Sequence, residues 1–337
     1  MVSVLRHIRR YPVLSLAALA ILIRMAMEVI PPLMAPTVIP RTDPDIAARF
    51  AVPADGLDQA GAVFHLGHSL VGRDMPVMLQ QLTAAHFGTA PDHHSQLGWG
   101  TPLRAHWDPA ETINGFDTEN AHPHYRDAKE ALTSGDYDAV VLTEMVEIRD
   151  AIAYFDSAEA LTNWARLARQ GNPNVRIYFY ETWHEVTDPA GWLTRLDLDL
   201  DRYWTGQILF PALLNLPEAT RIHVIPTGQV MAAVTRAVEA RGGMPGMQDR
   251  NDLFARTESG DLDPIHINDL GAYLTALTHF ATIYQRSPVG LPHELTRTDG
   301  SAFSPIPAET ARLMQEITWE VVKTQPLSGI FAENPTK

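Results

Sequence analysis

The sequence predicts an α/β domain in which a central parallel sheet carries helices on both faces. Short apolar runs of strand length alternate with longer amphipathic stretches of helical period, which is typical of repeated strand–helix–strand units. The chain has 337 residues, of which 45% are hydrophobic, so it can enclose one large core without a second domain. We expect this domain to cover residues 61–330.

Four strands are predicted where apolar runs are bounded by turn residues, at residues 62–66, 139–142, 175–180 and 222–225. Helical periodicity predicts seven helices, at residues 75–86, 125–133, 158–169, 203–214, 230–240, 270–285 and 308–323. Ligands of such sheets bind beyond the carboxyl ends of the strands. The residues that follow each strand are therefore the first candidates for a functional site.

Composition excludes several classes of function. The chain has 26 basic and 40 acidic residues, a net charge of -14, which disfavours nucleic acid and favours a neutral small molecule as partner. It has no cysteine, so disulfides, thiolate metal sites and cysteine nucleophiles are excluded. The absence of cysteine leaves the redox compartment open, because exported proteins can lack disulfides.

The N-terminus has the pattern of an export signal. Basic residues within positions 6–10 precede an apolar run at residues 11–23, and the apolar character continues to residue 30 if Arg24 and Glu28 pair on one helix face. Because no small-residue cleavage pattern precedes Pro31, an uncleaved signal anchor is favoured over a cleaved signal peptide. A buried N-terminal helix of a cytosolic protein is the alternative.

This interpretation predicts an exported, periplasmic or extracytoplasmic protein that is anchored to the membrane by residues 1–30. Residues 31–60 are rich in proline and acidic residues and show no sustained period, which indicates a linker between the anchor and the domain.

Ser69 is the first candidate catalytic residue. It follows the first predicted strand in the segment Gly67-His68-Ser69-Leu70, and a helix is expected to begin near Asp74, whose side chain would cap it. A serine on a strand-to-helix turn exposes its hydroxyl beside the free N–H groups of the helix. The alternative is a turn without a catalytic role.

Asp263 and His266 form the second candidate motif. A serine hydroxyl needs a base to accept its proton, and a carboxylate three residues before a histidine on a turn can hold the imidazole in the required tautomer. The alternative is a helix N-cap, in which Asp263 or Asn268 satisfies backbone N–H groups.

Taken together, the two motifs resemble the first and last blocks of the SGNH (GDSL-like) hydrolase family. The Ser69 segment is similar to the GDSL block, with His68 in place of the acidic residue. Asp263 and His266 are similar to the terminal Asp-x-x-His block, and Gly271 stands five residues after the histidine. The segment at residues 98–103, Gly-Trp-Gly-Thr-Pro-Leu, resembles the second block, whose glycine N–H is an oxyanion donor in the family.

The resemblance implies a flavodoxin-like three-layer α/β sandwich and ester hydrolysis through an acyl-enzyme on Ser69. It implies a neutral acylated saccharide or lipid-like ester as substrate, with no cofactor and no metal ion. Gly100 is the expected second-block donor, with Gly98 as the alternative. Acyl transfer to a sugar hydroxyl would use the same acyl-enzyme, because it differs only in the second acceptor.

The third block departs from the family pattern. The family places an asparagine after the central strand, whereas this strand is followed by Thr143 and Glu144. Thr143 can donate a hydroxyl to the oxyanion, but an ionised Glu144 would oppose it unless burial keeps the carboxyl neutral or the side chain binds substrate. Asn114 and Asn120 are alternative donors.

Three further interpretations remain open. Trp183 and His184 follow another predicted strand and are candidate pocket residues, the alternative being that Trp183 packs under a loop and His184 is solvated. A cluster rich in histidine would suit a metal hydrolase, although its spacing matches no standard site; its members are Asp92, His93, His94, His106, His122 and His124. A non-catalytic carbohydrate-binding or envelope-assembly protein on the same fold is the other rival.

Overall fold

Five parallel strands form the central sheet of this protein, whose computed structural model describes residues 42–54 and 56–330. The order across the sheet is β2-β1-β3-β4-β5, which is the flavodoxin-like order. The prediction of a parallel α/β sheet is thereby confirmed. The strands are β1 (Val63–Leu66), β2 (His93–Gln96), β3 (Ala139–Leu142), β4 (Arg176–Glu181) and β5 (Ile222–Pro226).

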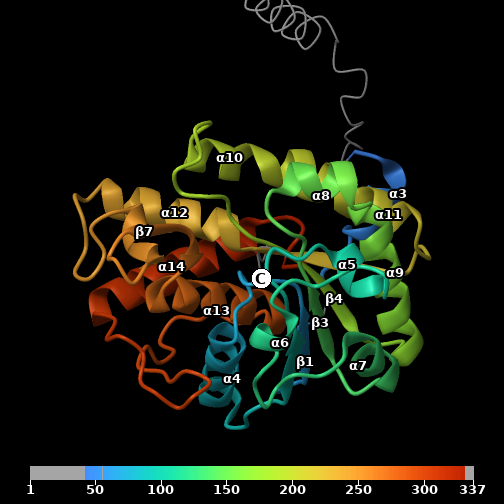
Figure 1. Cartoon of the computed structure of the whole chain (residues 1–337), viewed down its shortest axis with the longest axis horizontal. Helices are drawn as coiled ribbons and strands as arrows, with labels where there is room; N and C mark the ends of the chain where they lie inside the picture. Colours follow the sequence, from blue (N-terminus) through green and yellow to red (C-terminus); the bar gives the residue numbers. More distant parts are fainter. Residues whose placement is uncertain (1–41, 55, 331–337) are drawn as a thin grey trace, which may run out of the picture. The chain divides into compact units, whose positions relative to one another are not determined.

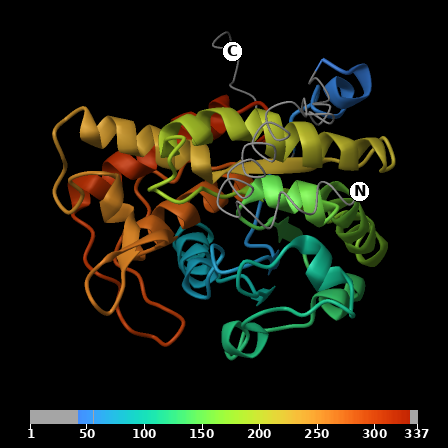
Figure 2. The ribbon, with the colours of Figure 1, turned by 45° about the horizontal axis from the view of Figure 1, so that its top comes forward.

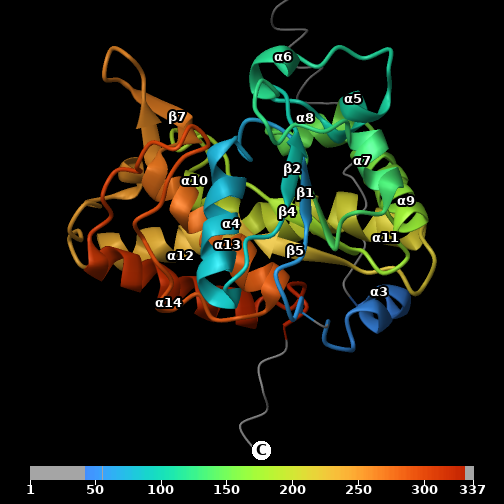
Figure 3. The ribbon, with the colours of Figure 1, turned by 90° about the horizontal axis from the view of Figure 1, so that it is seen from below.

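Helices cover both faces of the sheet (Figures 1 and 3). Along β3, Val141 packs into the core on one face, whereas Val140 and Leu142 pack into the core on the other. The first face is covered by α4 (Asp74–Phe87), α12 (Thr227–Glu239), α13 (Asp269–Tyr284) and α14 (Ala308–Thr324). The second is covered by α5 (Leu103–Trp107), α7 (Ala128–Ser134), α9 (Ser157–Gly171) and α11 (Phe210–Leu214).

The edge strand β2 was not predicted, because its sequence, His-His-Ser-Gln, is polar. Its side chains are buried by ring stacking and, for Gln96, by hydrogen bonds. The ring of His93 stacks on that of His124 with centroids 3.9 Å apart, and Gln96 accepts the backbone N–H of Ala128 and contacts His106. A hydrophobicity pattern cannot detect a strand that is buried in this way.

Three predicted helices have different bounds in the structure. Helix α7 begins at Ala128 rather than residue 125, because Asp127 caps it by accepting the N–H of Glu130. Helix α12 begins at Thr227, directly after β5. The helix predicted at residues 203–214 is part of a continuous run made of α10 (Trp192–Asp199), the π-helix η1 (Leu200–Leu209) and α11 (Figure 2).

Smaller elements complete the described part of the chain. They are α3 (Pro44–Arg49), α6 (Phe116–Glu119), α8 (Ile148–Tyr154), η2 (Arg250–Leu253) and the antiparallel strands β6 (Phe254–Arg256) and β7 (Leu262–Ile267). The β6–β7 hairpin and α6 lie at the same end of the sheet (Figure 3).

Part of the predicted linker forms the helix α3, which is docked onto the domain. Asp43 caps α3, and the guanidinium of Arg49 donates to the backbone carbonyls of Leu216, Pro217 and Thr220. The predicted N-terminal hydrophobic helix lies outside the described residues. Within residues 42–54 and 56–330, no helix combines the length and the apolar character that a membrane span requires.

Candidate active site

Ser69 lies on the tight turn between β1 and α4. The turn is closed by the N–H of Val71, which donates to the carbonyl of His68 at 2.9 Å, and Gly72 continues the chain at a φ of 66°. Asp74 does not cap α4 as predicted. It is the first residue of the helix, and its carboxylate accepts the N–H of Thr298 instead.

The structure brings Ser69 together with His266 and Asp263, although almost 200 residues separate them in the sequence. His266 Nε2 lies 3.1 Å from Ser69 Oγ, and His266 Nδ1 lies 2.9 Å from Asp263 Oδ2. If the serine hydroxyl donates to Nε2, then Nδ1 carries the proton and donates to the carboxylate. This arrangement is that of a nucleophile, a general base and an orienting acid.

The pair Asp263 and His266 lies on β7 rather than on the predicted turn. Asp263 Oδ1 accepts the backbone N–H groups of Ile265 and His266, each at 3.0 Å. Burial opposes ionisation of this carboxyl, but the N–H groups and the imidazole together lower its pKa. Asn268, not Asp263, caps the following helix α13, because its side chain accepts the N–H groups of Leu270 and Gly271.

Ser69 and His266 open onto a cleft of about 880 Å³ beyond the carboxyl ends of β1 and β3. In this strand order, the sheet changes direction between β1 and β3, which is where ligands of such folds bind. The cleft is lined by His68, Ser69, Leu70, Gly72, Arg73, Asp74, Trp99, Gly100, Glu119, Val146, Glu147, His184, Glu185, Asp188, Pro189, Arg195, Ile265 and His266.

Two backbone N–H groups are placed to stabilise an oxyanion. Within the described chain, the N–H groups of Ser69 and Gly100 donate to no protein acceptor, and both residues line the cleft. Gly98 is buried instead, since a Cβ there would approach Thr101 Oγ1 and Ile113 Cγ2 to within 2.4 Å. The geometry therefore favours Gly100 over Gly98, and its role as a donor stays a prediction.

The residues predicted to complete the oxyanion site from the third block do not reach the cleft. Thr143 is fully buried and its hydroxyl donates to the carbonyl of Tyr180 at 2.7 Å. Asn120 uses its amide to accept the N–H of Leu97 and to donate to the carbonyls of Leu97 and Phe116. Asn114 is not among the residues that line the cleft.

Glu144 is fully buried and supports the surrounding loops rather than substrate. Its Oε1 accepts the N–H groups of Leu103 at 3.2 Å and Met145 at 2.8 Å, which neighbouring loops present. Burial raises the pKa of Glu144 to about 7, against the opposing effect of these N–H groups and the hydroxyl of Ser157. Glu144 is thus not among the residues that line the cleft, which argues against its predicted role as an oxyanion or substrate residue.

His68, which replaces the acidic residue of the family pattern, connects the serine turn to β3. Its Nε2 lies 2.8 Å from the carbonyl of Glu144, and its Nδ1 accepts the N–H of Leu70 at 3.4 Å. Burial lowers the pKa of His68 to about 4, so the ring is neutral and Nε2 carries the hydrogen. His68 thus fixes the position of the turn that carries Ser69.

Trp183 and His184 have different surroundings. Trp183 is fully buried, and its indole N–H donates to the carbonyl of Ile265 at 2.8 Å, so it supports the strand that carries His266 and does not contact the cleft. Its prediction as a pocket residue is wrong. His184 does line the cleft, and its Nε2 lies 3.1 Å from Asp199 Oδ2.

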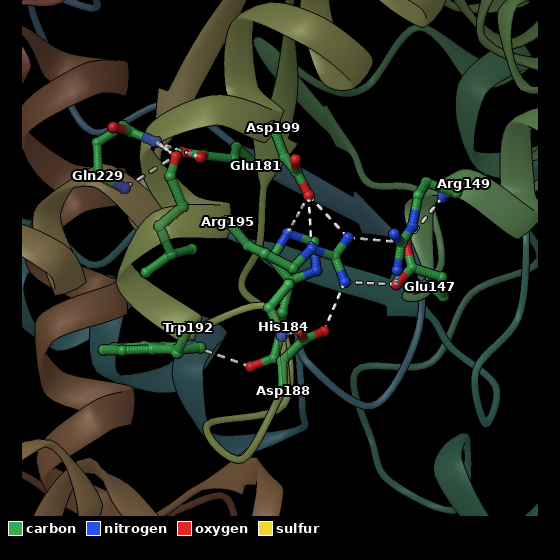
Figure 4. A network of polar contacts seen from close by, with 11 residues as sticks. Glu147, Arg149, Glu181, His184, Asp188, Trp192, Arg195, Asp199 and Gln229 are labelled. Carbon is green, nitrogen blue, oxygen red and sulfur yellow. Dashed lines mark hydrogen bonds and ion pairs between the residues drawn. The ribbon is translucent and has the colours of Figure 1, made fainter. Parts of the chain in front are cut away.

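Arg195, which was not predicted from the sequence, forms part of the cleft wall and lies at the centre of a network of polar contacts, shown in Figure 4. Arg195 is buried, and its guanidinium bonds the carboxylates of Glu147, Asp188 and Asp199 at 2.5 to 2.9 Å. Burial opposes the charge of Arg195, but the three carboxylates raise its pKa. The only feature of the sequence that could have indicated this ion pair is the spacing of Arg195 and Asp199, which lie one helical turn apart.

The histidine-rich cluster lies on and beside β2, where His93 stacks on His124. Within residues 42–54 and 56–330, no group of three or more histidine or acidic side chains is arranged to hold a metal ion. Burial lowers the pKa of His93 to about 3, so its ring is neutral and packs as part of the edge of the sheet.

Comparisons with known proteins concern the fold. No protein-family model matches the sequence, and no curated protein matches it. A DUF4886 family protein from Bacteroides uniformis ATCC 8492 has a similar structure, with a TM-score of 0.50 and 17% identity over 77% of this chain and 94% of that chain. A putative GDSL-like lipase from Parabacteroides merdae ATCC 43184 matches with a TM-score of 0.43 and 13% identity, over 69% of this chain and 99% of that chain.

The strand order and the placement of the three catalytic candidates agree with the pattern that the sequence resembles. The strand order is flavodoxin-like, and the fold is similar to that of the DUF4886 family protein. In this fold the turn that contains Ser69 follows β1, and His266 approaches it from the hairpin that precedes α13.

Proposed function

We propose that this protein is a serine ester hydrolase that acts through an acyl-enzyme, with an O-acylated saccharide or another small neutral ester as substrate. The proposal rests on one observation, the chain of contacts from Ser69 through His266 to Asp263 at the wall of a cleft. A serine, an imidazole and a carboxylate that contact one another in this order match a nucleophile, a general base and an orienting acid.

In this mechanism Ser69 Oγ attacks the ester carbonyl while His266 Nε2 accepts its proton. The negative charge that develops on the carbonyl oxygen is met by the N–H groups of Ser69 and Gly100. His266 then gives the proton to the leaving alcohol, and a water molecule repeats the sequence on the acyl-enzyme. Asp263 holds the imidazole and stabilises its charged form.

The charge of the cleft supports a neutral substrate. Five acidic side chains and two arginines line it, so a phosphate or carboxylate group on the substrate would be repelled. The acidic residues are Asp74, Glu119, Glu147, Glu185 and Asp188, and the arginines are Arg73 and Arg195.

Labelling with a fluorophosphonate tests the proposal directly. We expect the intact protein to be labelled at Ser69 and to hydrolyse short-chain esters. The Ser69→Ala variant should stay folded, lose labelling and lose turnover by about 10³-fold or more. A folded variant with near-normal turnover would contradict the role of Ser69. Absence of labelling in the parent protein would favour the metal-dependent or the non-catalytic alternative.

We also propose that residues 1–30 act as an export signal or membrane anchor and place the domain outside the cytoplasm. The proposal rests on the basic residues at positions 6–10 and the apolar run that follows them. A reporter fused after residue 60 should be exported and should sediment with membranes. A cytosolic, membrane-free fusion would support the buried-helix alternative.

A further inference from the structure

Trp99 presents a large apolar surface to the cleft that contains Ser69 and His266. Trp99 is 52% exposed, which is unusual for a tryptophan outside a binding surface. The mechanism proposed above does not use this ring. Burying the exposed part of the ring against a ligand would release water from apolar surface and therefore favour binding.

The indole is held in a fixed orientation. A Cβ on Gly115 would lie 2.2 to 2.5 Å from ring atoms Cδ2, Cε2 and Cγ, so the ring packs directly on this glycine. Its Nε1–H donates to Glu119 Oε1 at 2.7 Å, and the backbone N–H of Trp99 donates to the carbonyl of Asn114, also at 2.7 Å. One ring face and one ring edge are therefore occupied, and the other face is left for a ligand.

The surroundings of this free face match the chemistry of a sugar ring. A pyranose combines an apolar face of C–H groups, which packs on aromatic rings, with hydroxyls around its edge that need hydrogen-bond acceptors. The carboxylates of Glu119 and Glu185 line the same cleft and can accept such hydrogen bonds, whereas Glu147 and Asp188 are already paired with Arg195. They would also repel a phosphate headgroup, which argues against a phospholipid in this position.

The position of Trp99 in the chain places a stacked ring beside the reaction. Trp99 directly precedes Gly100, whose N–H is the candidate oxyanion donor, and consecutive Cα atoms are about 3.8 Å apart. We propose that Trp99, seated on Gly115 and Glu119, is the platform on which a neutral sugar ring stacks while its ester group faces Ser69. This inference rests on the proposed esterase function and assigns its substrate class.

The test compares two acetyl esters that differ in the alcohol: an O-acetylated methyl glycoside and ethyl acetate, with acid release followed by titration. The measured quantity is the ratio of kcat/KM for the glycoside to that for ethyl acetate. Trp99→Ala should lower this ratio by about tenfold, mainly through KM for the glycoside, because one stacking contact is lost. Trp99→Phe, which keeps a flat ring, should restore most of it.

A matched control is available in Tyr154, which is 71% exposed and does not line the cleft. Tyr154→Ala should leave the ratio unchanged. An unchanged ratio in Trp99→Ala would overturn the inference. The inference would also be overturned if Trp99→Ala lowered kcat/KM for butanoyl esters but not for acetyl esters of the same alcohol. The ring would then bind the acyl chain rather than the sugar. If the parent protein hydrolyses neither ester, the proposed function itself fails.

Discussion

Replacing Glu144 by glutamine should change how the stability of this protein depends on pH. The side chain is fully buried, and burial raises its pKa to about 7 from the ordinary value of 4.5. Between these two pH values the folded protein holds a proton that the unfolded chain releases. The free energy of unfolding of the parent protein therefore falls, through this group, as the pH rises from about 4.5 to about 7.

The size of the effect follows from the two pKa values. One pKa unit corresponds to about 1.4 kcal/mol, so the contribution of Glu144 changes by about 3 kcal/mol across this range. Glutamine cannot ionise. Its Oε1 can still accept the N–H groups of Leu103 and Met145, so the loops that the carboxyl connects keep their hydrogen bonds.

Urea unfolding of both proteins at pH 5, 6, 7 and 8 measures the difference directly. The advantage of Glu144→Gln over the parent should grow by about 3 kcal/mol from pH 5 to pH 8. Other titrating groups cancel in this difference. Glu258→Gln, which removes one exposed carboxylate, should give a curve parallel to that of the parent. Parallel curves for Glu144→Gln would refute the assignment of a buried, neutral carboxyl.

The same variant tests whether Glu144 takes part in the reaction. Because the side chain does not line the cleft, ester turnover at pH 6 should stay within about twofold of the parent. A tenfold loss of turnover would instead indicate that Glu144 acts as a base or binds substrate, because the loss of acid–base assistance typically has an effect of this size or more.

Two further predictions follow from the site. Asp263→Asn should lower kcat by about 10³-fold or more without unfolding the protein, because the amide keeps the backbone contacts but favours the wrong tautomer of His266. Steady-state kinetics measures kcat, and circular dichroism shows whether the variant is folded. Near-normal turnover would contradict this prediction. Arg195→Met should destabilise the protein by about 3 kcal/mol in urea, because Asp188 and Asp199 lose their arginine and Glu147 keeps only Arg149. The exposed ion pair lost in Arg236→Met should cost less than about 1 kcal/mol, and equal losses in the two variants would contradict this reasoning.

Comparison of the predicted and observed helices shows how far periodicity alone can reach. Helices with a strong apolar face, such as α9 and α14, were found within a few residues of their bounds, because their apolar spacing reflects the face that they bury. Strand β2 was missed because its buried side chains are histidines and polar residues, which are stabilised by ring stacking and hydrogen bonds to distant residues. Hydrophobic periodicity depends only on neighbouring residues, so it cannot indicate such distant partners.

The sequence by itself determined four of the five strands, the turn that contains Ser69, and the choice of Ser69, Asp263 and His266 as candidates, because these depend on local spacing and on residue types with restricted chemistry. Only the tertiary structure decided which side chains enter the cleft. Glu144 follows a strand, as a pocket residue would, but its carboxyl accepts the N–H of Leu103, the first residue of α5. Arg195 lies in a helix far along the chain, yet it forms the cleft wall, because a cleft is a surface that distant segments make together.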